Sequence, residues 1–369
     1  MKFTIDRESI LKPLLVVRGV IEQRQTLPVL SNILVTARNG VLAFTATDSE
    51  VEIEARATVD GLDEGEITVP ARKFIDICQA LPPGATVAFG LDDDGRVHIR
   101  SGRSRYSLTT LPAGEFPTTE EIADESTFVV SQSELKRLID LTQFAMARQD
   151  VRYYLNGLLL EVGPENVKAV ATDGHRLAVA RLDGTTGLEE ARSIIVPRKA
   201  VLELSRLLTA EDSELKVRLG TNAIHLTIDN VRLTSKLVDG KFPDYGRVIP
   251  DAATCDKHLS LDRESLRQCL VRASVLSSDK HRTVRLTLDT GNLTVLANNP
   301  DQETAVDELE LEYDGESLEI GFNVSYLIDA LATLPSETAD VFLTDSSSSC
   351  LIQPQGVSSC QFVVMPMRL

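Results

Sequence analysis

The segment FTIDRESILK (residues 3–12) decides the fold, because close variants of it return twice along the chain. The second copy is FVVSQSELKR (128–137) and the third is LSLDRESLRQ (259–268), with starts 125 and 131 residues apart. Each copy begins with alternating apolar and polar residues and continues with apolar residues at helical spacing. This pattern predicts a short strand followed by an amphipathic helix. Self-similarity at a fixed period indicates homologous structural units.

Three further landmarks recur with the same period. A second helix is predicted in the segments VPARKFIDICQALP (69–82), VPRKAVLELSRLL (196–208) and FNVSYLIDALATLP (322–335). The tripeptides ATD (46–48), ATD (171–173) and ANN (297–299) each end an alternating apolar stretch, and the dipeptide Phe-Pro stands at 116–117 and 242–243. Four landmarks with one period predict three homologous domains, at residues 1–125, 126–254 and 255–369.

Each repeat is expected to fold as a strand, a helix, several strands, a second helix and several strands. Ser131 and Asp262 stand at helix N-cap positions, and Pro70 and Pro197 precede helices, which suits a first helical turn. Period-two alternation broken by Asp-Gly and Gly-Asn turns predicts antiparallel strands. The predicted fold class is therefore α+β, with two helices packed on antiparallel sheets in every repeat.

The composition is that of a globular protein, with 43% hydrophobic and 25% charged residues among 369. There is no apolar run of about 18 residues, so we expect no membrane association. The five cysteines are odd in number and lack CxxC spacing, which argues against disulfides and zinc and fits a reducing cytoplasm. The net charge of −17, from 38 basic and 55 acidic residues, argues against a surface that binds nucleic acid all over.

Long matching stretches resemble the beta subunit of bacterial DNA polymerase III, the family of sliding clamps. They are VPARKF (69–74), RSGRSR (100–105), DVRYYLNG (150–157), ATDGHRLA (171–178), TSKLVDGKFPDY (234–245), EIGFNVSY (319–326) and VVMPMRL (363–369). The resemblance implies a head-to-tail homodimer of three-domain crescents that closes into a ring of six domains. The ring would encircle duplex DNA without sequence specificity, slide, and confer processivity on polymerases. It also implies a non-catalytic protein with no cofactor and no metal.

The resemblance offers a resolution of the charge problem, because basic residues gather on the predicted helices. Five of the six helices carry cations, namely Arg7, Lys12, Arg18, Arg72, Lys73, Lys136, Arg137, Arg198, Lys199, Arg206, Arg263, Arg267 and Arg272. The sixth, at 324–334, carries none. Acidic residues gather in predicted strands and turns, such as residues 92–94 and 307–312. Helices facing the hole would then give an acidic protein a positive lining. For any single cation, a solvated helix face is the plain alternative.

By position in the family, DNA-binding residues are expected in all three repeats. They are Arg24, Arg72, Lys73, Arg148, Gln149, Tyr153, Tyr154, Arg198, Lys199, Lys280 and Arg282. Tyr153 and Tyr154 are candidates for stacking on an unpaired base near a primer end, with core packing as the alternative.

The turn at 172–177 combines Asp173 and His175, which by themselves suit a general base or a metal pair. No nucleophile or ligand-spaced cluster accompanies them, and TDSE (47–50) and NNPD (298–301) occupy the same turn in the other repeats. The family instead assigns this turn to a pocket for the peptide motifs of polymerases and the clamp loader. The pocket residues are Leu155, Thr172, Gly174, His175, Arg176, Leu177, Pro243, Arg247, Val248, Asn323, Tyr326, Ser346, Val363, Val364, Met365, Pro366, Met367 and Arg368.

Apolar residues and two adaptable methionines suit such a pocket, and Arg176 and Arg247 are expected to satisfy polar atoms of the bound segment. Ser347 stands where an apolar residue is expected, which predicts a more polar wall. The partners implied by the family are the replicative polymerase alpha subunit, the clamp-loader delta subunit, translesion and repair polymerases, mismatch-repair proteins and ligase.

The alternating segment after Arg100 is a candidate open sheet edge. Pairing it with the third domain of another chain would close the ring. We expect Tyr106 and Leu108 to meet Val275 and Leu276. The basic residues Arg96, Arg103 and Arg105 would meet the acidic stretch from Asp301 to Glu303.

Two alternatives from other classes stay open on the sequence. One is a hydrolase built on the turn at Asp173 and His175, and the other is an adaptor that binds partners but never encircles DNA.

Overall fold

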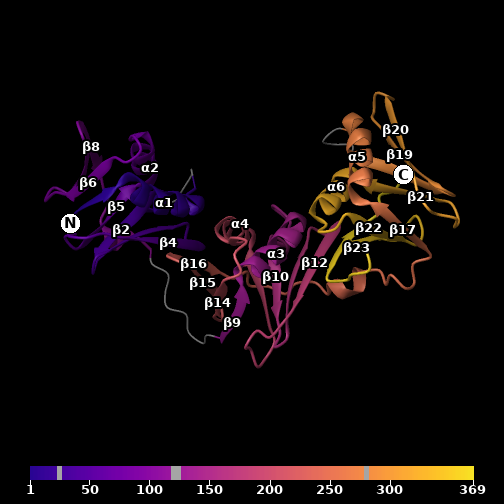
Figure 1. Cartoon of the computed structure of the whole chain (residues 1–369), viewed down its shortest axis with the longest axis horizontal. Coiled ribbons are helices and arrows are strands. Elements are labelled where there is room, and N and C mark those ends of the chain that lie inside the picture. The colour runs from indigo at the N-terminus through magenta and orange to yellow at the C-terminus, as the bar shows by residue number, and fades with distance from the viewer. Residues whose placement is uncertain (23–26, 118–125, 278–281) are drawn as a thin grey trace. The chain divides into compact units, whose positions relative to one another are not determined.

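The computed structural model describes residues 1–22, 27–117, 126–277 and 282–369. Its chain divides into two compact units (Figure 1). Unit 1 comprises residues 1–133 and 199–237, and unit 2 comprises residues 134–198 and 238–369. No helix in these described ranges is both long enough and apolar enough to cross a lipid bilayer.

Unit 1 contains two antiparallel sheets. The smaller sheet has the order β1 (Lys2–Asp6), β6 (Thr86–Leu91), β7 (Arg96–Ser101), β8 (Ser104–Thr109). The larger sheet has the order β5 (Gly65–Pro70), β2 (Asn32–Arg38), β3 (Val41–Thr47), β4 (Val51–Thr58), β16 (Val231–Lys236), β15 (Ala223–Ile228), β14 (Glu214–Leu219), β9 (Ser126–Ser131). The helical segments are α1 (Arg7–Val17), η1 (Arg18–Val20), η2 (Pro28–Ser31), α2 (Ala71–Ala80), η3 (Ala113–Glu115) and, from its second residue, α4 (Arg198–Leu207).

Unit 2 is built in the same way. Its larger sheet has the order β13 (Arg192–Pro197), β10 (Gly157–Val162), β11 (Asn166–Thr172), β12 (Arg176–Asp183), β24 (Cys360–Val364), β23 (Cys350–Pro354), β22 (Thr338–Leu343), β17 (Lys257–Asp262). Its smaller sheet has the order β20 (Thr304–Glu310), β19 (Asn292–Asn298), β18 (Thr283–Asp289), β21 (Leu318–Asn323). The helical segments are α3 (Gln132–Thr142), η4 (Gln143–Ala145), η5 (Tyr153–Leu155), η6 (Tyr245–Val248), α5 (Arg263–Ala273), η7 (Ser274–Leu276) and α6 (Val324–Thr333). Helices α5 and α6 lie side by side (Figure 1).

Each larger sheet is continuous across two repeats of the sequence. In unit 1, β4 pairs with β16 from Val51 opposite Ser235 to Ala55 opposite Val231. In unit 2, β12 pairs with β24 from Arg176 opposite Val364 to Ala180 opposite Cys360. The strands β4 and β12 both follow the repeated Thr-Asp turn, and β16 and β24 are both last strands of a repeat. The junction between successive repeats is therefore itself repeated.

The core of unit 1 is linked by aromatic rings. Phe74 of α2 is fully buried and lies 6.5 Å from Phe44 of β3 and 5.9 Å from Phe89 of β6, centroid to centroid. Phe89 stacks on Phe3 of β1 at 4.6 Å. One helix thus packs against both sheets. This explains the helical spacing of apolar residues in the segment 69–82, because Ala71, Phe74, Ile75 and Cys78 form the buried face of α2.

In the first and third repeats, the first helix begins at a capping carboxylate. Asp262 accepts a hydrogen bond from Ser265 N at 2.7 Å, as its sequence position predicts. Asp6 accepts one from Ser9 N at 2.8 Å at the equivalent position of the first repeat. The hydrogen bonds from Ser9 hold the pKa of Asp6 below its ordinary value, because they favour the ionised carboxylate.

All five cysteines lie in described parts of the chain, and none forms a disulfide. Burial raises the pKa of Cys78 to about 12, of Cys269 to about 11 and of Cys360 to about 12, and it also raises the pKa of Cys350. Cys255 alone among the five is partly exposed.

The predicted fold class is confirmed, with antiparallel sheets and two helices in each of three repeats. The domain boundaries stay a prediction. The compact units divide the central repeat between them because its outer strands β16 and β12 continue the sheets of the neighbouring repeats.

Replacing Ile53 of β4 by alanine should lower the free energy of unfolding by about 2–5 kcal/mol, because it leaves a cavity in a strand that carries two repeats. Ile53 is fully buried and pairs with Leu233 of β16. Urea unfolding followed by circular dichroism measures the change. Thr227→Ala, at an exposed position of β15, is the control and should change stability by less than about 0.5 kcal/mol.

Candidate functional site

The turn between β11 and β12 uses its polar side chains to close its own backbone. The Asp173 Oδ1 atom accepts hydrogen bonds from His175 N at 2.9 Å and Arg176 N at 3.0 Å. The Thr172 hydroxyl donates to Arg176 O at 2.6 Å and accepts from Gly174 N at 3.0 Å. Gly174 has a φ of 88°, in the left-handed region that favours glycine.

The same turn recurs in the first repeat with the same hydrogen bonds. Asp48 Oδ1 accepts from Glu50 N at 2.9 Å and Val51 N at 2.7 Å, and the Thr47 hydroxyl donates to Val51 O at 2.9 Å. Asp173 is therefore part of a structural turn, not a general base. Among the described residues, no group of three or more His, Cys, Asp or Glu side chains is arranged to hold a metal ion.

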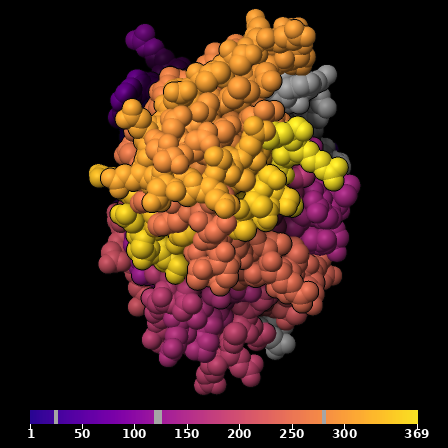
Figure 2. Space-filling view, turned by 90° about the vertical axis from the view of Figure 1, so that its right-hand side faces the viewer, coloured from indigo at the N-terminus to yellow at the C-terminus, as the bar shows by residue number. Residues whose placement is uncertain are grey.

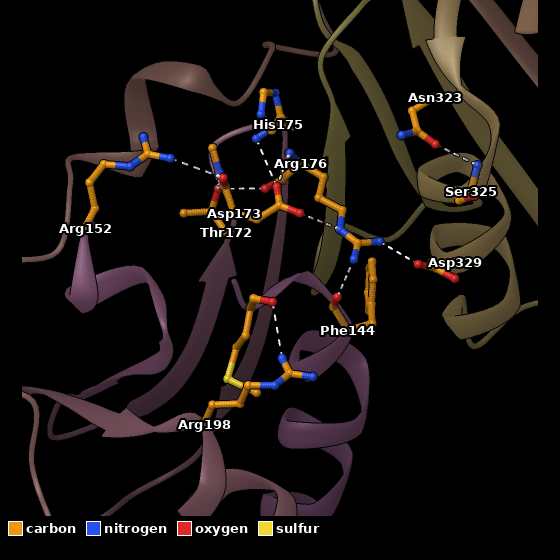
Figure 3. A network of polar contacts seen from close by, with 12 residues as sticks. Phe144, Arg152, Thr172, Asp173, His175, Arg176, Arg198, Asn323, Ser325 and Asp329 are labelled. Atoms are coloured by element: carbon orange, nitrogen blue, oxygen red, sulfur yellow. Dashed lines mark hydrogen bonds and ion pairs between the residues drawn. The ribbon is translucent and has the colours of Figure 1, made fainter. Parts of the chain in front are cut away.

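Arg176 is the centre of a polar network in unit 2 (Figure 3). Its guanidinium donates to Asp173 Oδ2 at 3.1 Å, to Asp329 Oδ2 at 2.6 Å and to the Phe144 carbonyl oxygen at 2.7 Å. It also lies over the ring of Tyr326, 4.5 Å from the centroid. These partners come from the turn before β12, from α6 and from η4, so one cation holds two repeats together.

This network adds a structural role to the one that the sequence suggests for Arg176. Its side chain is 13% exposed, and three of its five N–H groups already have partners, so it shapes the site, while its contact with polar atoms of a ligand stays a prediction. Arg247 differs, because its side chain is 84% exposed and its ion pair with Asp244, at 2.7 Å, lies on the surface. Sequence reasoning missed Asp329. A helical signal existed, since Asp329 stands three residues after Tyr326 on the same face of α6.

Most of the predicted pocket residues converge around the β12–β24 junction. Leu177 and Val363 are paired across it and are buried in one apolar cluster with Leu155. His175 stacks on Tyr326 with centroids 6.5 Å apart, and its carbonyl oxygen accepts a hydrogen bond from Met365 N at 2.9 Å.

The chain end adds exposed apolar surface to this junction. Val248, Met365 and Met367 are 54%, 49% and 40% exposed. In the space-filling view of Figure 2, the yellow C-terminal segment reaches the surface. Met367 N donates to Gly321 O at 2.8 Å, so the end of the chain is bound to β21, and the Met367 sulfur accepts a hydrogen bond from the Thr283 hydroxyl at 3.7 Å.

The remaining pocket residues have local structural roles or open positions. Asn323 accepts a hydrogen bond from Ser325 N at 3.0 Å and caps α6. Ser346 is exposed in a loop that Asp345 orders by accepting hydrogen bonds from Ser347 and Ser348. These contacts lower the pKa of Asp345 to about 2. The following residues are also partly or fully exposed: Pro243, Pro366 and Arg368.

A separate hollow of about 700 Å³ lies in unit 1, between η1 and α2, and is not part of this pocket. It is lined by Arg18, Ile21, Arg72 and Ile75 among others, and mixes two cations with the carboxylates of Glu22 and Asp76.

The predicted DNA-binding residues fall into several groups. Arg24 and Lys280 lie outside the described residues. Exposed positions are held by Arg72, Lys73, Arg148, Gln149, Tyr153 and Arg282. The Arg72 side chain is 90% exposed, and its 3.9 Å ion pair with Asp76 is a weak surface contact. Tyr154 packs against the apolar cluster while Tyr153 is 57% exposed, so Tyr153 is the one free to stack on a base.

Two further predicted DNA-binding cations are engaged inside the protein. Arg198 donates to Met146 O at 3.2 Å, and burial, followed by the charges of Arg148 and Arg176, lowers the pKa of Arg198. Lys199 donates to Val20 O at 2.9 Å and to Glu22 at 2.8 Å, and also pairs with Asp48. The sequence did not predict the partners of Lys199, because all three lie more than 150 positions away.

The predicted dimer edges are outer strands. The strand β8 is last in its sheet, and β20 is last in the smaller sheet of unit 2. Val275 is 76% exposed, and Arg96, Arg103, Arg105, Asp301 and Glu303 are exposed. Tyr106 and Leu276 are half-buried, whereas Leu108 is 8% exposed and packs into its own sheet.

Three family models match almost the whole chain. They are the N-terminal, central and C-terminal domains of the DNA polymerase III beta subunit, at residues 1–120, 129–244 and 246–368. The chain belongs to the DNA polymerase III beta subunit family.

Relatives agree over their full lengths. The beta sliding clamp of Pseudomonas aeruginosa is 50% identical over 370 residues, which cover 100% of both chains. The crystal structure of the DNA polymerase III subunit beta from Pseudomonas aeruginosa matches with a TM-score of 0.95 at 49% identity, again over 100% of both chains. A second structure from that organism, with the same scores, is a sliding clamp bound to griselimycin.

The sliding clamps are processivity factors and not enzymes, so this chain is a non-catalytic clamp of the replication machinery. The hydrolase alternative is wrong, in agreement with the role of Asp173 in closing a turn. The adaptor alternative is wrong as well, because the chain belongs to the sliding clamps.

Replacing Lys199 by alanine should lower the free energy of unfolding by about 1–3 kcal/mol, because the 9% exposed Asp48 carboxylate loses its cation. Thermal melting measures this. Lys73→Ala, which removes an exposed lysine from α2, is the matched control and should leave the melting temperature unchanged. Equal melting of both variants would contradict a structural role for Lys199.

Proposed function

We propose that two copies of this chain close into a head-to-tail ring around duplex DNA, and that partner proteins bind through peptide motifs in the pocket of unit 2. The proposal covers the replicative polymerase alpha subunit, the clamp-loader delta subunit and the repair proteins that the resemblance implies. A cytoplasmic location is part of the proposal and is supported by the free cysteines.

The observation that carries the ring is the repeated strand junction. Each repeat has a strand that follows the repeated turn (β4, β12, β20) and a last strand (β8, β16, β24). Two of the three junctions form within the chain, β4 with β16 and β12 with β24. The remaining strands, β20 and β8, are outer strands whose second edges lack a strand partner among the described residues. Joining β20 of one copy to β8 of the other uses both edges twice and closes six repeats into a ring.

The side chains at these edges support the same pairing. Val275 and Val306 are 76% and 56% exposed near β20, which is unusual for valine unless a partner covers it. The basic residues Arg103 and Arg105 at β8 complement the acidic Asp301 and Glu303 before β20.

For DNA, we propose that exposed cations of the helices and their following loops contact phosphates. Arg72, Lys73 and Arg148 are the best candidates, because they are exposed and lie on the segments that the family points to. Phosphate contacts carry no sequence information, so they permit sliding. A net charge of −17 leaves the rest of the surface unfavourable for DNA.

For partner motifs, we propose the surface formed by His175, Tyr326, Val248, Met365 and Met367. It combines stacked rings, exposed thioethers and an exposed valine around a buried apolar cluster, which suits an apolar peptide. A relative that is 49% identical binds griselimycin, which supports a ligand site in this family.

Replacing Val306 by aspartate should convert the dimer into monomers, because an unpaired carboxylate would be buried in the closed interface. Analytical ultracentrifugation gives the mass, near 81 kDa for two chains of 40.4 kDa in the parent. Val357→Asp, at a 49% exposed position in the turn after β23, is the control and should stay dimeric. A dimeric Val306→Asp variant would place the interface elsewhere.

A comparison of the parent with the Val306→Asp variant on circular DNA tests whether the ring encircles DNA. The parent, loaded on circular DNA by the clamp loader, should be retained until the DNA is linearised, whereas Val306→Asp should not be retained. Retention of the parent on linear DNA with free ends would indicate site binding rather than encirclement.

Deleting residues 365–369 should lower the affinity for a clamp-binding motif peptide of the replicative polymerase by at least about 100-fold. Several apolar side chains are removed at once, each worth about 1.5–3 kcal/mol when fully buried. Fluorescence anisotropy with the labelled peptide measures the loss, and ultracentrifugation should show an intact dimer. Unchanged affinity would contradict the pocket.

A further inference from the structure

We propose that the hydrogen bond from Tyr245 to Glu161 is a positioning device for the peptide pocket. It holds the segment 243–248, whose Arg247 and Val248 form one wall of the pocket, in the conformation that receives a ligand. The inference rests on the pocket proposed above and adds two residues that do not line it.

The bond joins an irregular segment to a rigid strand. The Tyr245 hydroxyl, at the first residue of η6, donates to Glu161 Oε2 at 2.6 Å. Glu161 is an interior residue of β10, which pairs on one side with Lys168 of β11 and on the other with Ser193 of β13. A hydrogen bond of this length to a carboxylate is charge-assisted and about twice as strong as a neutral one.

The donor keeps its proton throughout the physiological range. Burial, together with the hydrogen bond to Glu161, raises the pKa of Tyr245 well above its ordinary value. The bond therefore acts as a permanent tether and not as a pH switch.

The segment has few other polar attachments. Its ion pair between Arg247 and Asp244 lies within the segment itself. Among the described residues, the bond to Glu161 is the one side-chain hydrogen bond that joins residues 243–250 to another element. The ring of Tyr245 and the side chain of Ile249 pack against the apolar cluster, and such apolar contacts are non-directional. The hydroxyl supplies the directional contact.

The wall that this bond orients has exposed side chains. The side chain of Arg247 is 84% exposed, and Val248 is 54% exposed. A ligand that met a mobile wall would have to order it, at a cost in affinity, whereas a wall fixed in advance avoids this cost. Changes of this kind act mainly on the dissociation rate.

Tyr245→Phe tests the proposal with the loss of one oxygen atom, since the ring can stay in the apolar cluster. The probe is the labelled clamp-motif peptide, with griselimycin as a second ligand. We expect peptide dissociation from the full-length dimer to become roughly fivefold faster, with the dimer mass unchanged and the protein still folded at the assay temperature despite a lower melting temperature. Tyr313→Phe is the matched control, because its hydroxyl donates to Glu316 O at 2.7 Å in the loop after β20. It should bind like the parent.

Two further variants, each combined with Tyr245→Phe, distinguish positioning of the wall from a general loss of structure. Glu161→Gln should speed dissociation to a similar or smaller extent, and combining it with Tyr245→Phe should add nothing, because both remove the same bond. In a Val248→Ala, Arg247→Ala background, where the wall side chains are absent, Tyr245→Phe should have no further effect.

The outcomes are distinct. A parent protein that fails to bind both ligands would overturn the pocket and this inference with it. A parent that binds, with Tyr245→Phe binding equally well, would overturn the inference alone. An undiminished effect of Tyr245→Phe in the background without wall side chains would also overturn it, because the tyrosine would then act by another route.

Discussion

Strand pairing across repeat boundaries is the constraint on which the rest of this structure depends. A sheet edge leaves a row of N–H and C=O groups without partners, and each repeat has two such edges. The chain satisfies four of its six repeat edges internally, through β4 with β16 and β12 with β24. The same pairing determines where the ligand site forms. Leu177 lies opposite Val363, and the Met365 amide donates to His175 O, so the residues of the proposed site come together only where two repeats meet.

Polar residues near the proposed site make hydrogen bonds within the protein. Asp173 closes a turn, Arg176 holds α6 and η4 to β12, and Asn323 caps a helix. What remains for a partner is mostly apolar or aromatic surface. A surface of this composition can accept several different peptides, because adaptable thioethers and ring faces make few directional demands.

The sequence predicts the local and repeated features of this fold well. The period in the chain predicts three repeats, helical spacing in 69–82 predicts the buried face of α2, and Asp262 caps α5 as its position indicates. The equivalence of the turns at Asp48 and Asp173 also argues correctly against catalysis. Such features depend on neighbouring residues, whose spacing is visible in the sequence.

Contacts between distant segments escape this reasoning. Lys199 reads as a free cation on a helix but pairs with Glu22 and Asp48, and nothing in the sequence indicates that Arg176 pairs with Asp329. In each case the partner is brought close by folding alone, and no local pattern records it.

The burial of four thiols has a practical consequence for chemical labelling. The thiolate is the species that attacks maleimides and disulfides, and it is scarce where burial disfavours the charge. Cys78, Cys269, Cys350 and Cys360 are therefore shielded twice, by lack of access and by the energy of ionisation. Cys255 is left as the reactive sulfur, beside the apolar cluster at the start of the C-terminal repeat. The natural sequence thus already carries one selective attachment point for a fluorophore or spin label, next to the surface where ligand arrival would change its signal.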